Sequence, residues 1–350
     1  MLFSNGKIEP VRACPDRFHF SGVPSKRELK NLADNADIKT LQTTENISRK
    51  AAEILNESFF KFRPDVALRL YGFYNKERIC NLEFCSSMDN VEHFSADCIH
   101  SATNINEIAK IPNLKSLGIG IYNHDNFDIL NEVSPNLEDL CLGETKSKKP
   151  DLRSLQRFKD LKSLLISGHH KNIDAVTHCR KLESLSLRGI STDNLNYLKP
   201  LSSLSDLNIH LGGIKDFSAL EHCTTIKKLD LFQIRGLSDL SFISKMKKLE
   251  VLFLQCLKNV QVLPDMQELI YLNRIVLETM NGLKDVSSLE RIQSLKKFVH
   301  ISAHNMQPED YVPLFKNKNV ISLRVGFGSE KKNVEFCKLA KQYGKNADEF

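Results

Sequence analysis

The sequence predicts an α/β solenoid, with a curved parallel sheet on its concave side and short helices or 3₁₀ turns on its convex side. A six-residue pattern of the form LxxLxL recurs along most of the 350 residues. A second set of apolar residues, spaced by three, follows each copy of the pattern. Composition agrees with a packed chain, because 41% of the residues are hydrophobic and 26% are charged.

The repeats have a nearly constant length. Successive copies from Leu114 to Val320 start 21 to 25 residues apart. Two degenerate copies, "LRLYGF" at Leu68 and "VEHFSA" at Val91, are in phase with them and bring the total to about twelve. The clear copies begin at Leu114, Leu137, Leu161, Leu182, Leu204, Ile226, Leu249, Leu272, Leu295 and Val320.

Each repeat contains a strand followed by a turn. The last two apolar residues of LxxLxL are two positions apart and therefore point to the same side of a strand. The later spacing of three, as in Leu240, Ile243 and Met246, is that of a helical turn. Neither element can bury its apolar side alone, so the repeats must stack to form one continuous core.

This pattern resembles the leucine-rich repeat superfamily, over roughly residues 68 to 328. The repeats "IRGLSDLSFISKMKK" and "MNGLKDVSSLERIQS" are similar to the short repeats of bacterial cytosolic members. That family usually has Asn or Cys eight residues after the first Leu. Here the column contains Thr145, His169, Ile190, Gly212, Ile234, Leu257, Met280 and Ala303, so the usual Asn ladder is absent.

The two ends depart from the period, and we expect them to cap the solenoid of residues 66–330. Residues 1–65 form the predicted N-terminal cap, with an amphipathic helix in "NISRKAAEILNESFF" that begins at an Asn46 N-cap. Residues 331–350 form the predicted C-terminal capping helix, with Val334, Cys337 and Leu339 facing inward. Gly344 is expected to end that helix.

Charge and cysteine content suggest a cytoplasmic protein. The net charge is +6, and the densest basic run lies at residues 146–159 without interleaved aromatic residues. No stretch has the length and hydrophobicity of a secretory signal or a membrane span. Nine Cys without a CxxC pair fit a reducing compartment better than a set of disulfides.

The sequence predicts no catalytic, cofactor or metal site. Neither "GIG" at Gly118 nor "GFG" at Gly326 continues as a phosphate-binding loop. The pairs His178–Cys179 and His222–Cys223 are two repeats apart, about 10 Å at the strand spacing of a sheet, which is too far to share one metal ion. His300 occupies a core position of its repeat and needs a buried hydrogen-bond partner.

The outward positions of the strands carry the candidate binding site. They lie two, four and six residues after the start of each repeat, and equal positions become neighbours in a parallel sheet. We expect Phe232, Phe253, Val276, Val299 and Ile301 to cluster between charged residues. The predicted partner-binding residues are Lys228, Asp230, Phe232, Phe253, Gln255, Arg274, Val276, Glu278, Val299 and Ile301.

Two interpretations of this surface stay open. The aromatic residues either bind a partner or only pack on one another. We favour a non-enzymatic solenoid that binds a partner protein on its concave face, as a regulator or as an immunity-type protein that neutralises a toxin. The alternative is a nucleic-acid-binding protein that uses the basic residues 146–159.

Overall fold

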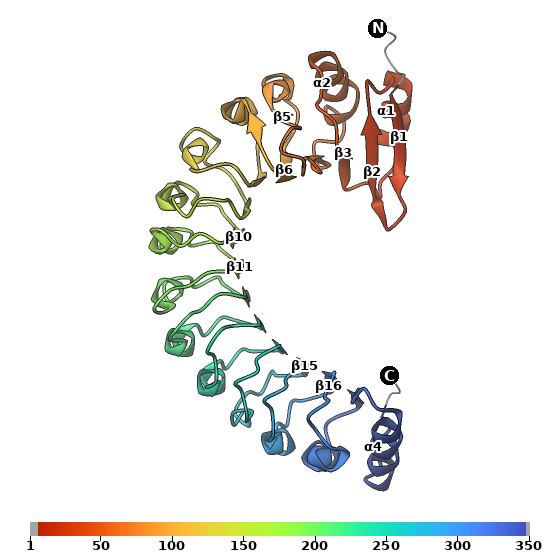
Figure 1. Ribbon diagram of the computed structural model, residues 1–350, viewed down its shortest axis with the longest axis vertical. Coiled ribbons are helices and arrows are strands. Elements are labelled where there is room, and N and C mark those ends of the chain that lie inside the picture. Colours follow the sequence, from red (N-terminus) through yellow and green to blue (C-terminus); the bar gives the residue numbers. More distant parts are fainter. Residues whose placement is uncertain (1–5, 348–350) are drawn as a thin grey trace. The chain divides into compact units, whose positions relative to one another are not determined.

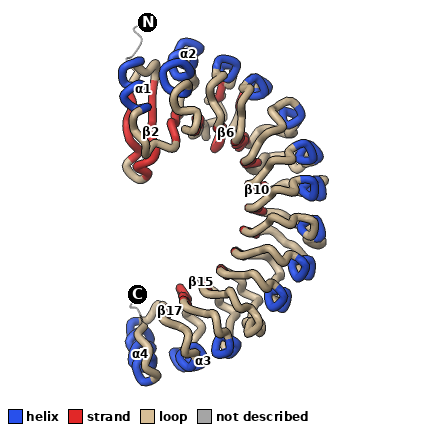
Figure 2. The backbone as a smooth tube through the Cα atoms, turned by 180° about the vertical axis from the view of Figure 1, so that it is seen from behind, coloured by secondary structure: helices blue, strands red, loops and turns tan. Residues whose placement is uncertain are grey.

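The computed structural model describes residues 6–347, which divide after Cys179 into two compact units, residues 6–179 and 180–347. In each unit the strands lie on the inner side and the helical turns on the outer side (Figures 1 and 2). The predicted class is therefore confirmed: parallel strands alternate with short 3₁₀ turns in successive repeats.

The first unit contains a sheet in which all neighbouring strands are parallel except β1 and β2. Its strands are β1 Lys7–Val11, β2 Cys14–Ser21, β3 Thr40–Thr43, β4 Ala67–Leu70, β6 His93–Ile99, β8 Ser116–Ile121, β9 Asp139–Leu142 and β10 Ser163–Ser167. A separate two-stranded sheet pairs β5 Cys80–Asn81 with β7 Ala102–Thr103. The helical segments are α1 Lys26–Ala33, α2 Arg49–Leu55, the π-helical η1 Asn56–Phe60, and the 3₁₀ turns η2 Glu83–Ser87, η3 Ile105–Lys110, η4 Asp128–Asn131, η5 Arg153–Arg157 and η6 Ile173–His178.

The second unit contains seven parallel strands in register. They are β11 Ser184–Arg188, β12 Asp206–His210, β13 Lys228–Phe232, β14 Val251–Gln255, β15 Arg274–Glu278, β16 Lys297–Ile301 and β17 Ser322–Val325. The 3₁₀ turns are η7 Asn196–Leu198, η8 Ser218–His222, η9 Ser241–Lys245, η10 Ser287–Arg291 and η11 Pro308–Tyr311. The unit ends with α3 Val312–Lys316 and α4 Glu330–Gln342.

The core follows the predicted period. Leu229, Leu252 and Ile275 occupy one row of paired positions across β13, β14 and β15, and each is at most 1% exposed. Cys179 and Cys223 are likewise buried on the turn side, in the apolar positions that the spacing indicates. All nine thiols are free.

Residues 7–65 form more than the predicted helix. They contribute β1, β2 and β3, and the last two strands extend the parallel sheet beyond the first recognisable repeat. The N-cap prediction was wrong: α2 begins after Ser48, whose side chain accepts the N–H of Ala51. Asn46 instead bridges the backbone of Ile79 and Asn81, because its amide can donate and accept at once.

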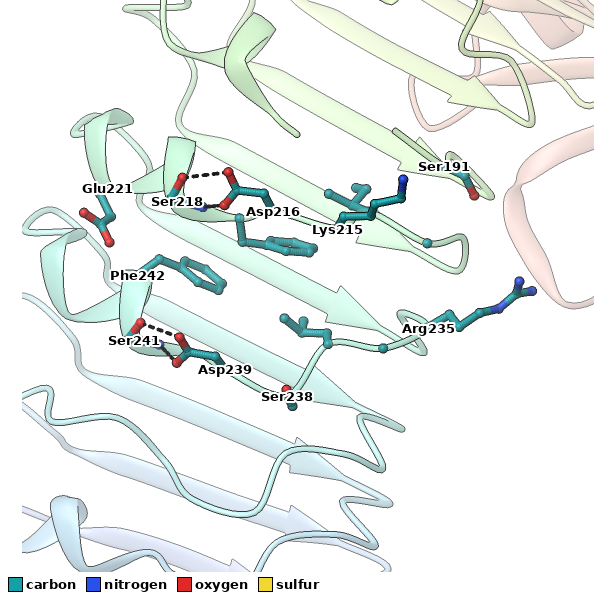
Figure 3. Close-up of a pocket in the computed structure, with 15 residues that line it drawn as sticks. Ser191, Lys215, Asp216, Ser218, Glu221, Arg235, Ser238, Asp239, Ser241 and Phe242 are labelled. Atoms are coloured by element: carbon teal, nitrogen blue, oxygen red, sulfur yellow. Dashed lines mark hydrogen bonds between the residues drawn. The ribbon is translucent and has the colours of Figure 1, made fainter. Parts of the chain in front are cut away.

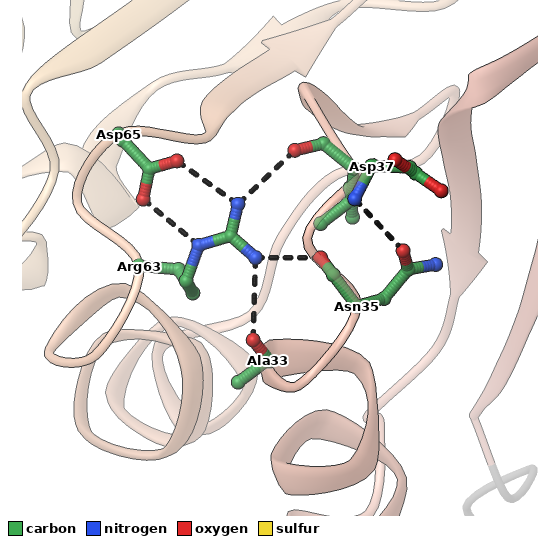
Figure 4. Close-up of polar contacts among 6 residues, drawn as sticks. Ala33, Asn35, Asp37, Arg63 and Asp65 are labelled. Carbon is green, nitrogen blue, oxygen red and sulfur yellow. Dashed lines mark hydrogen bonds and ion pairs between the residues drawn. The ribbon is translucent and has the colours of Figure 1, made fainter.

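Arg63 joins three segments of the first unit (Figure 4). Its guanidinium donates two hydrogen bonds of 2.9 Å to the Asp65 carboxylate. It also donates to the carbonyl oxygens of Ala33, the last residue of α1, and of Asn35 and Ile38, which follow the helix. Three of the five hydrogen bonds of this planar group thus go to carbonyls at and beyond the end of α1, so Arg63 fixes the connection from α1 to β3.

The chain leaves each of the strands β12 to β16 through a residue in the left-handed conformation. Seven residues after the repeat start, φ is +64° at Leu211, +48° at Gln233, +54° at Cys256, +52° at Thr279 and +57° at Ser302. The N–H groups of Leu211, Gln233, Cys256 and Thr279 each donate to the next strand, at 2.7 to 2.9 Å. These bonds continue the backbone hydrogen bonding between strands past the end of each strand. They lie one residue before the position, eight residues after the first Leu, at which leucine-rich repeats usually carry Asn.

An Asp or Asn precedes most 3₁₀ turns and accepts the backbone N–H two residues later. The Asp216, Asp239 and Asp285 carboxylates accept from Ser218, Ser241 and Ser287 at 2.7 to 2.8 Å. Asn126 and Asn194 make the same contact with Asp128 and Asn196 at 3.0 Å. These Asx turns satisfy backbone donors that a short helix leaves free.

Helix α4 lies in the segment where a C-terminal helix is expected, but the residues that it buries differ from the predicted ones. Phe336 and Ala340 are buried, whereas Val334 is 48% exposed and is corrected to a surface residue. Cys337 and Leu339 are half-buried. The rings of Tyr311, Phe315 and Phe327 surround Phe336 at centroid distances of 5.2 to 5.7 Å, so this large ring rather than Val334 sets the inward face.

Gly344 ends α4 as predicted, with φ +70°. Its N–H donates to Lys341 O, and the N–H of Lys345 donates to Ala340 O. This pair of bonds is the Schellman arrangement, in which glycine adopts the left-handed conformation without a steric penalty.

Candidate functional site

The ten predicted partner-binding residues lie on the strand side of the second unit, and we call them the β13–β16 face. They are Lys228, Asp230, Phe232, Phe253, Gln255, Arg274, Val276, Glu278, Val299 and Ile301. Along each of the four strands every second residue is buried, and the residues of the face occupy the alternate positions. Lys228 and Arg274 are exposed, and the other eight are half-buried.

Strand register arranges the face in rows. Asp230, Phe253, Val276 and Val299 are paired in succession from β13 to β16. The next row contains Phe232, Gln255, Glu278 and Ile301. Three apolar side chains, Phe253, Val276 and Val299, therefore form a continuous stripe across neighbouring strands.

The larger expected cluster of five apolar residues stays a prediction. Phe232 and Ile301 stand at opposite ends of their row, with Gln255 and Glu278 between them. Phe232 packs against His210, with ring centroids 5.7 Å apart and planes at 89°. Phe232 is also the diagonal neighbour of Phe253 on the adjacent strand, and Ile301 follows Val299 by two residues on β16, so each borders one end of the stripe.

Positive charge flanks the apolar stripe. Arg274 and Lys297 are paired positions on β15 and β16, both are exposed, and neither makes an ion pair with a residue in the range 6–347. Lys228, in contrast, lies 3.6 Å from the Asp206 carboxylate. Two cations beside half-buried apolar groups can therefore meet carboxylates of a partner.

The polar border on β12 was missed by the sequence reasoning. The Asn208 amide donates to Ser186 Oγ and Asp206 Oδ1 at 3.3 and 3.1 Å. His210 Nε2 lies 3.1 Å from Asp230 Oδ2. The outward positions of "LSDLNI" contain the signal, since they place polar residues directly before Asp230 and Phe232 in the register.

His300 has the buried partner that its core position requires. Its ring is fully buried, and Nδ1 lies 2.7 Å from the Tyr311 hydroxyl. Burial lowers the pKa of His300 to about 4. The imidazole is therefore neutral at neutral pH and belongs to the core.

The described residues contain no group of three or more metal-ligating side chains. His169 is buried and its Nε2 lies 3.1 Å from Gly143 O, and desolvation lowers its pKa.

Gly118 and Gly120 lie tightly against the preceding strand, since a Cβ at either would come within 3.1 to 3.2 Å of Ser95 or Asp97. Between residues 6 and 347, no helix is long and apolar enough to cross a bilayer.

The basic residues 146–159 lie in the first unit, where several of them make intramolecular contacts. Arg153 contacts the Asp151 carboxylate at 3.0 Å, and Arg157 donates to the carbonyls of Leu130 and Val133. Lys148 lies 3.7 Å from the Glu144 carboxylate. Part of the positive charge in this run is therefore matched within the unit.

The fold is similar to that of a known repeat protein. An internalin (inlF) from Listeria monocytogenes matches with a TM-score of 0.50 and 15% identity, over 92% of this chain and 82% of that one. The chain has the leucine-rich repeat fold. The leucine-rich repeat protein LIC12759 of Leptospira interrogans matches with a TM-score of 0.49 and 14% identity, over 91% of both chains. No protein-family model and no curated protein matches this sequence.

Proposed function

We propose that this leucine-rich repeat protein is a non-enzymatic interaction protein that binds a partner protein on the β13–β16 face. The observation that carries the proposal is the stripe of Phe253, Val276 and Val299 beside the exposed cations Arg274 and Lys297. A partially exposed aromatic residue surrounded by apolar and charged groups has the composition of an interface hot spot.

The fitting partner presents apolar side chains together with carboxylates. Burial of the stripe supplies affinity, and the two cations select acidic groups and speed association. Regulation or toxin neutralisation is the finer proposal for the consequence of this binding, and the identity of the captured partner decides between them.

Photo-crosslinking from two sides of one repeat tests the proposal. A photoreactive residue at Glu278 stands on the strand side, and one at Glu290 stands on the turn side of the same repeat. In a lysate of the source organism, we expect a protein adduct from position 278 and none from position 290. Adducts from position 290 alone would place the interface on the turn side.

A matched pair of substitutions tests the contribution of the stripe. The double variant Phe253→Thr, Val276→Thr places β-branched residues, which favour strands, at both positions but removes apolar contact area. We expect it to reduce the adduct at position 278 at least tenfold, whereas Tyr74→Thr, at a residue that is 70% exposed in the first unit, leaves the adduct unchanged. An undiminished adduct in the folded double variant would disprove the proposed site.

A further inference from the structure

A groove runs along the side of the second unit, between the loops that lead into η8 and η9 (Figure 3). Its volume is about 720 Å³, within the range of ligand-binding sites. The rings of Phe217 and Phe242 stack in it, with centroids 5.4 Å apart and planes at 23°. We call it the Leu237 groove, after the residue on its second wall.

Lateral hydrogen bonding between the two repeats that form the groove ends at Arg235, whose N–H donates to Gly212 O at 3.0 Å. On one side, the N–H groups of Lys215 and Asp216 donate to Thr192 O and Asp193 O of the preceding repeat, at 3.2 and 3.1 Å. Three repeats after Lys215, the N–H groups of Lys284 and Asp285 both donate to Gln261 O, at 2.8 and 3.2 Å. Neighbouring loops are therefore joined by backbone bonds on both sides of this position.

The segment 236–239 is not joined in this way. Within residues 6–347, the N–H groups of Gly236, Leu237, Ser238 and Asp239 make no hydrogen bond with either adjacent repeat. A Cβ at Gly236 would meet nothing within 4 Å, so this part of the segment stands clear of its neighbours. A second groove of about 600 Å³ lies on its other side, lined by residues 238–241, 244, 259 and 261–265.

Unmatched backbone groups along both walls complement another backbone. The facing wall also has an N–H without a partner among the described residues, that of Ile214. Backbone donors and acceptors prefer to be paired, and extended peptides bind proteins by completing such rows.

Charge decides which peptide fits. The carboxylates of Asp216 and Asp239 accept hydrogen bonds from Ser218 and Ser241, and Lys215 is paired with Asp193 at 2.7 Å. The side chains of Arg235 and Glu221 make no ion pair or hydrogen bond with any residue of the range 6–347. Figure 3 places these two side chains at opposite ends of the groove.

We propose that the Leu237 groove binds an extended peptide segment, which carries an acidic side chain near Arg235 and a basic side chain near Glu221. The peptide backbone pairs with residues 236–239, and its side chains lie over Phe217, Phe242 and Leu237, which are buried beneath the groove. This site is separate from the β13–β16 face and does not depend on the function proposed for it.

Selection from a displayed library of random octapeptides, with the full chain as bait, tests the site. Selected peptides are synthesised, and their binding is mapped by amide hydrogen exchange. We expect at least tenfold slower exchange at residues 237–239 in the complex. No change is expected at Lys215 and Asp216, whose N–H groups are already bonded. A selection that yields no peptide protecting residues 237–239 would overturn the proposal.

Charge reversal separates this site from the β13–β16 face. Arg235→Glu is expected to weaken the selected peptides at least tenfold, and Arg235→Glu, Glu221→Arg to favour peptides with the two charges exchanged. Arg274→Glu, on the β13–β16 face, should leave peptide affinity unchanged. Equal binding to the wild type and the charge-reversed chain would overturn the assignment, as would loss of binding in Arg274→Glu alone.

Discussion

At the scale of single residues, His300 shows how a polar group is tolerated at a buried strand position that is apolar in the neighbouring repeats. In the register its neighbours are Leu277 and Val325, and its ring is fully buried. The Tyr311 hydroxyl, itself buried, supplies one hydrogen bond. Since burial penalises the imidazolium, the folded state keeps the ring neutral, with its pKa near 4 rather than the ordinary 6.5.

This lowered pKa predicts a loss of stability in mild acid. In the unfolded chain His300 binds a proton near pH 6.5, but in the folded chain it does so only near pH 4. The contribution of His300 to the free energy of unfolding is therefore fully present above pH 6.5 and is lost as the pH falls toward 4. Between pH 7 and 4.5, His300 should account for about 2 kcal/mol of lost unfolding free energy. His300→Asn keeps a hydrogen-bonding group near the Tyr311 hydroxyl but does not titrate.

Urea unfolding at the two pH values measures the effect. The loss between pH 7 and 4.5 should be smaller by about 2 kcal/mol in His300→Asn than in the wild type. The remaining loss includes His124 and His169, whose pKa values are also lowered by burial. His222→Asn, at an exposed position, controls for removal of one imidazole. Identical acid responses in His300→Asn and the wild type would contradict the prediction.

At the scale of elements, the 3₁₀ turns depend on the Asx residues before them. The Asp285 carboxylate accepts the N–H of Ser287 at 2.7 Å, at the start of η10. We expect Asp285→Ala to lower the free energy of unfolding by about 1 kcal/mol, as the loss of a helix-capping side chain does. Asp285→Asn should stay within a few tenths of a kcal/mol of the wild type.

The natural repeats support this choice of control, because Asn126 and Asn194 cap η4 and η7 in the same way. Chemical denaturation of the three proteins in parallel gives the comparison. If alanine and asparagine had equal effects, the side-chain oxygen would not be what stabilises the turn.

At the scale of the molecule, the sequence period predicts the core and the strand register but not every contact on the surface. The row Asp230, Phe253, Val276 and Val299 follows from counting alone, because parallel strands in register bring equal positions together. The packing of Phe232 on His210 does not follow from counting, because it depends on which side-chain rotamers the two rings adopt.

Two other features lie beyond the period. Strands β2 and β3 lack the LxxLxL pattern, so nothing in residues 14–43 identifies them as members of the same sheet. The Leu237 groove depends on missing backbone bonds between loops of ordinary length and composition. Both depend on how loops are placed in space, which hydrophobic spacing does not encode.

The repeat architecture predicts that damage to one repeat stays local. Leu252 on β14 is fully buried and pairs with Leu229 and Ile275 of the adjacent repeats. Leu252→Ala should cost about 2–5 kcal/mol in its surroundings, from lost burial and the resulting cavity. Because each repeat of a solenoid contacts mainly its neighbours, the loss should be confined to nearby strands.

Native-state hydrogen exchange resolves where the stability is lost. In Leu252→Ala, amides of β13, β14 and β15 should exchange at least tenfold faster, and those of β3 and β4 at wild-type rates. The matched variant is Leu68→Ala, at a fully buried residue of β4, which should accelerate β3, β4 and β6 and leave β13–β15 unchanged. If either variant accelerated all of these strands equally, the chain would unfold as one cooperative body, and the nearest-neighbour description of its repeats would fail.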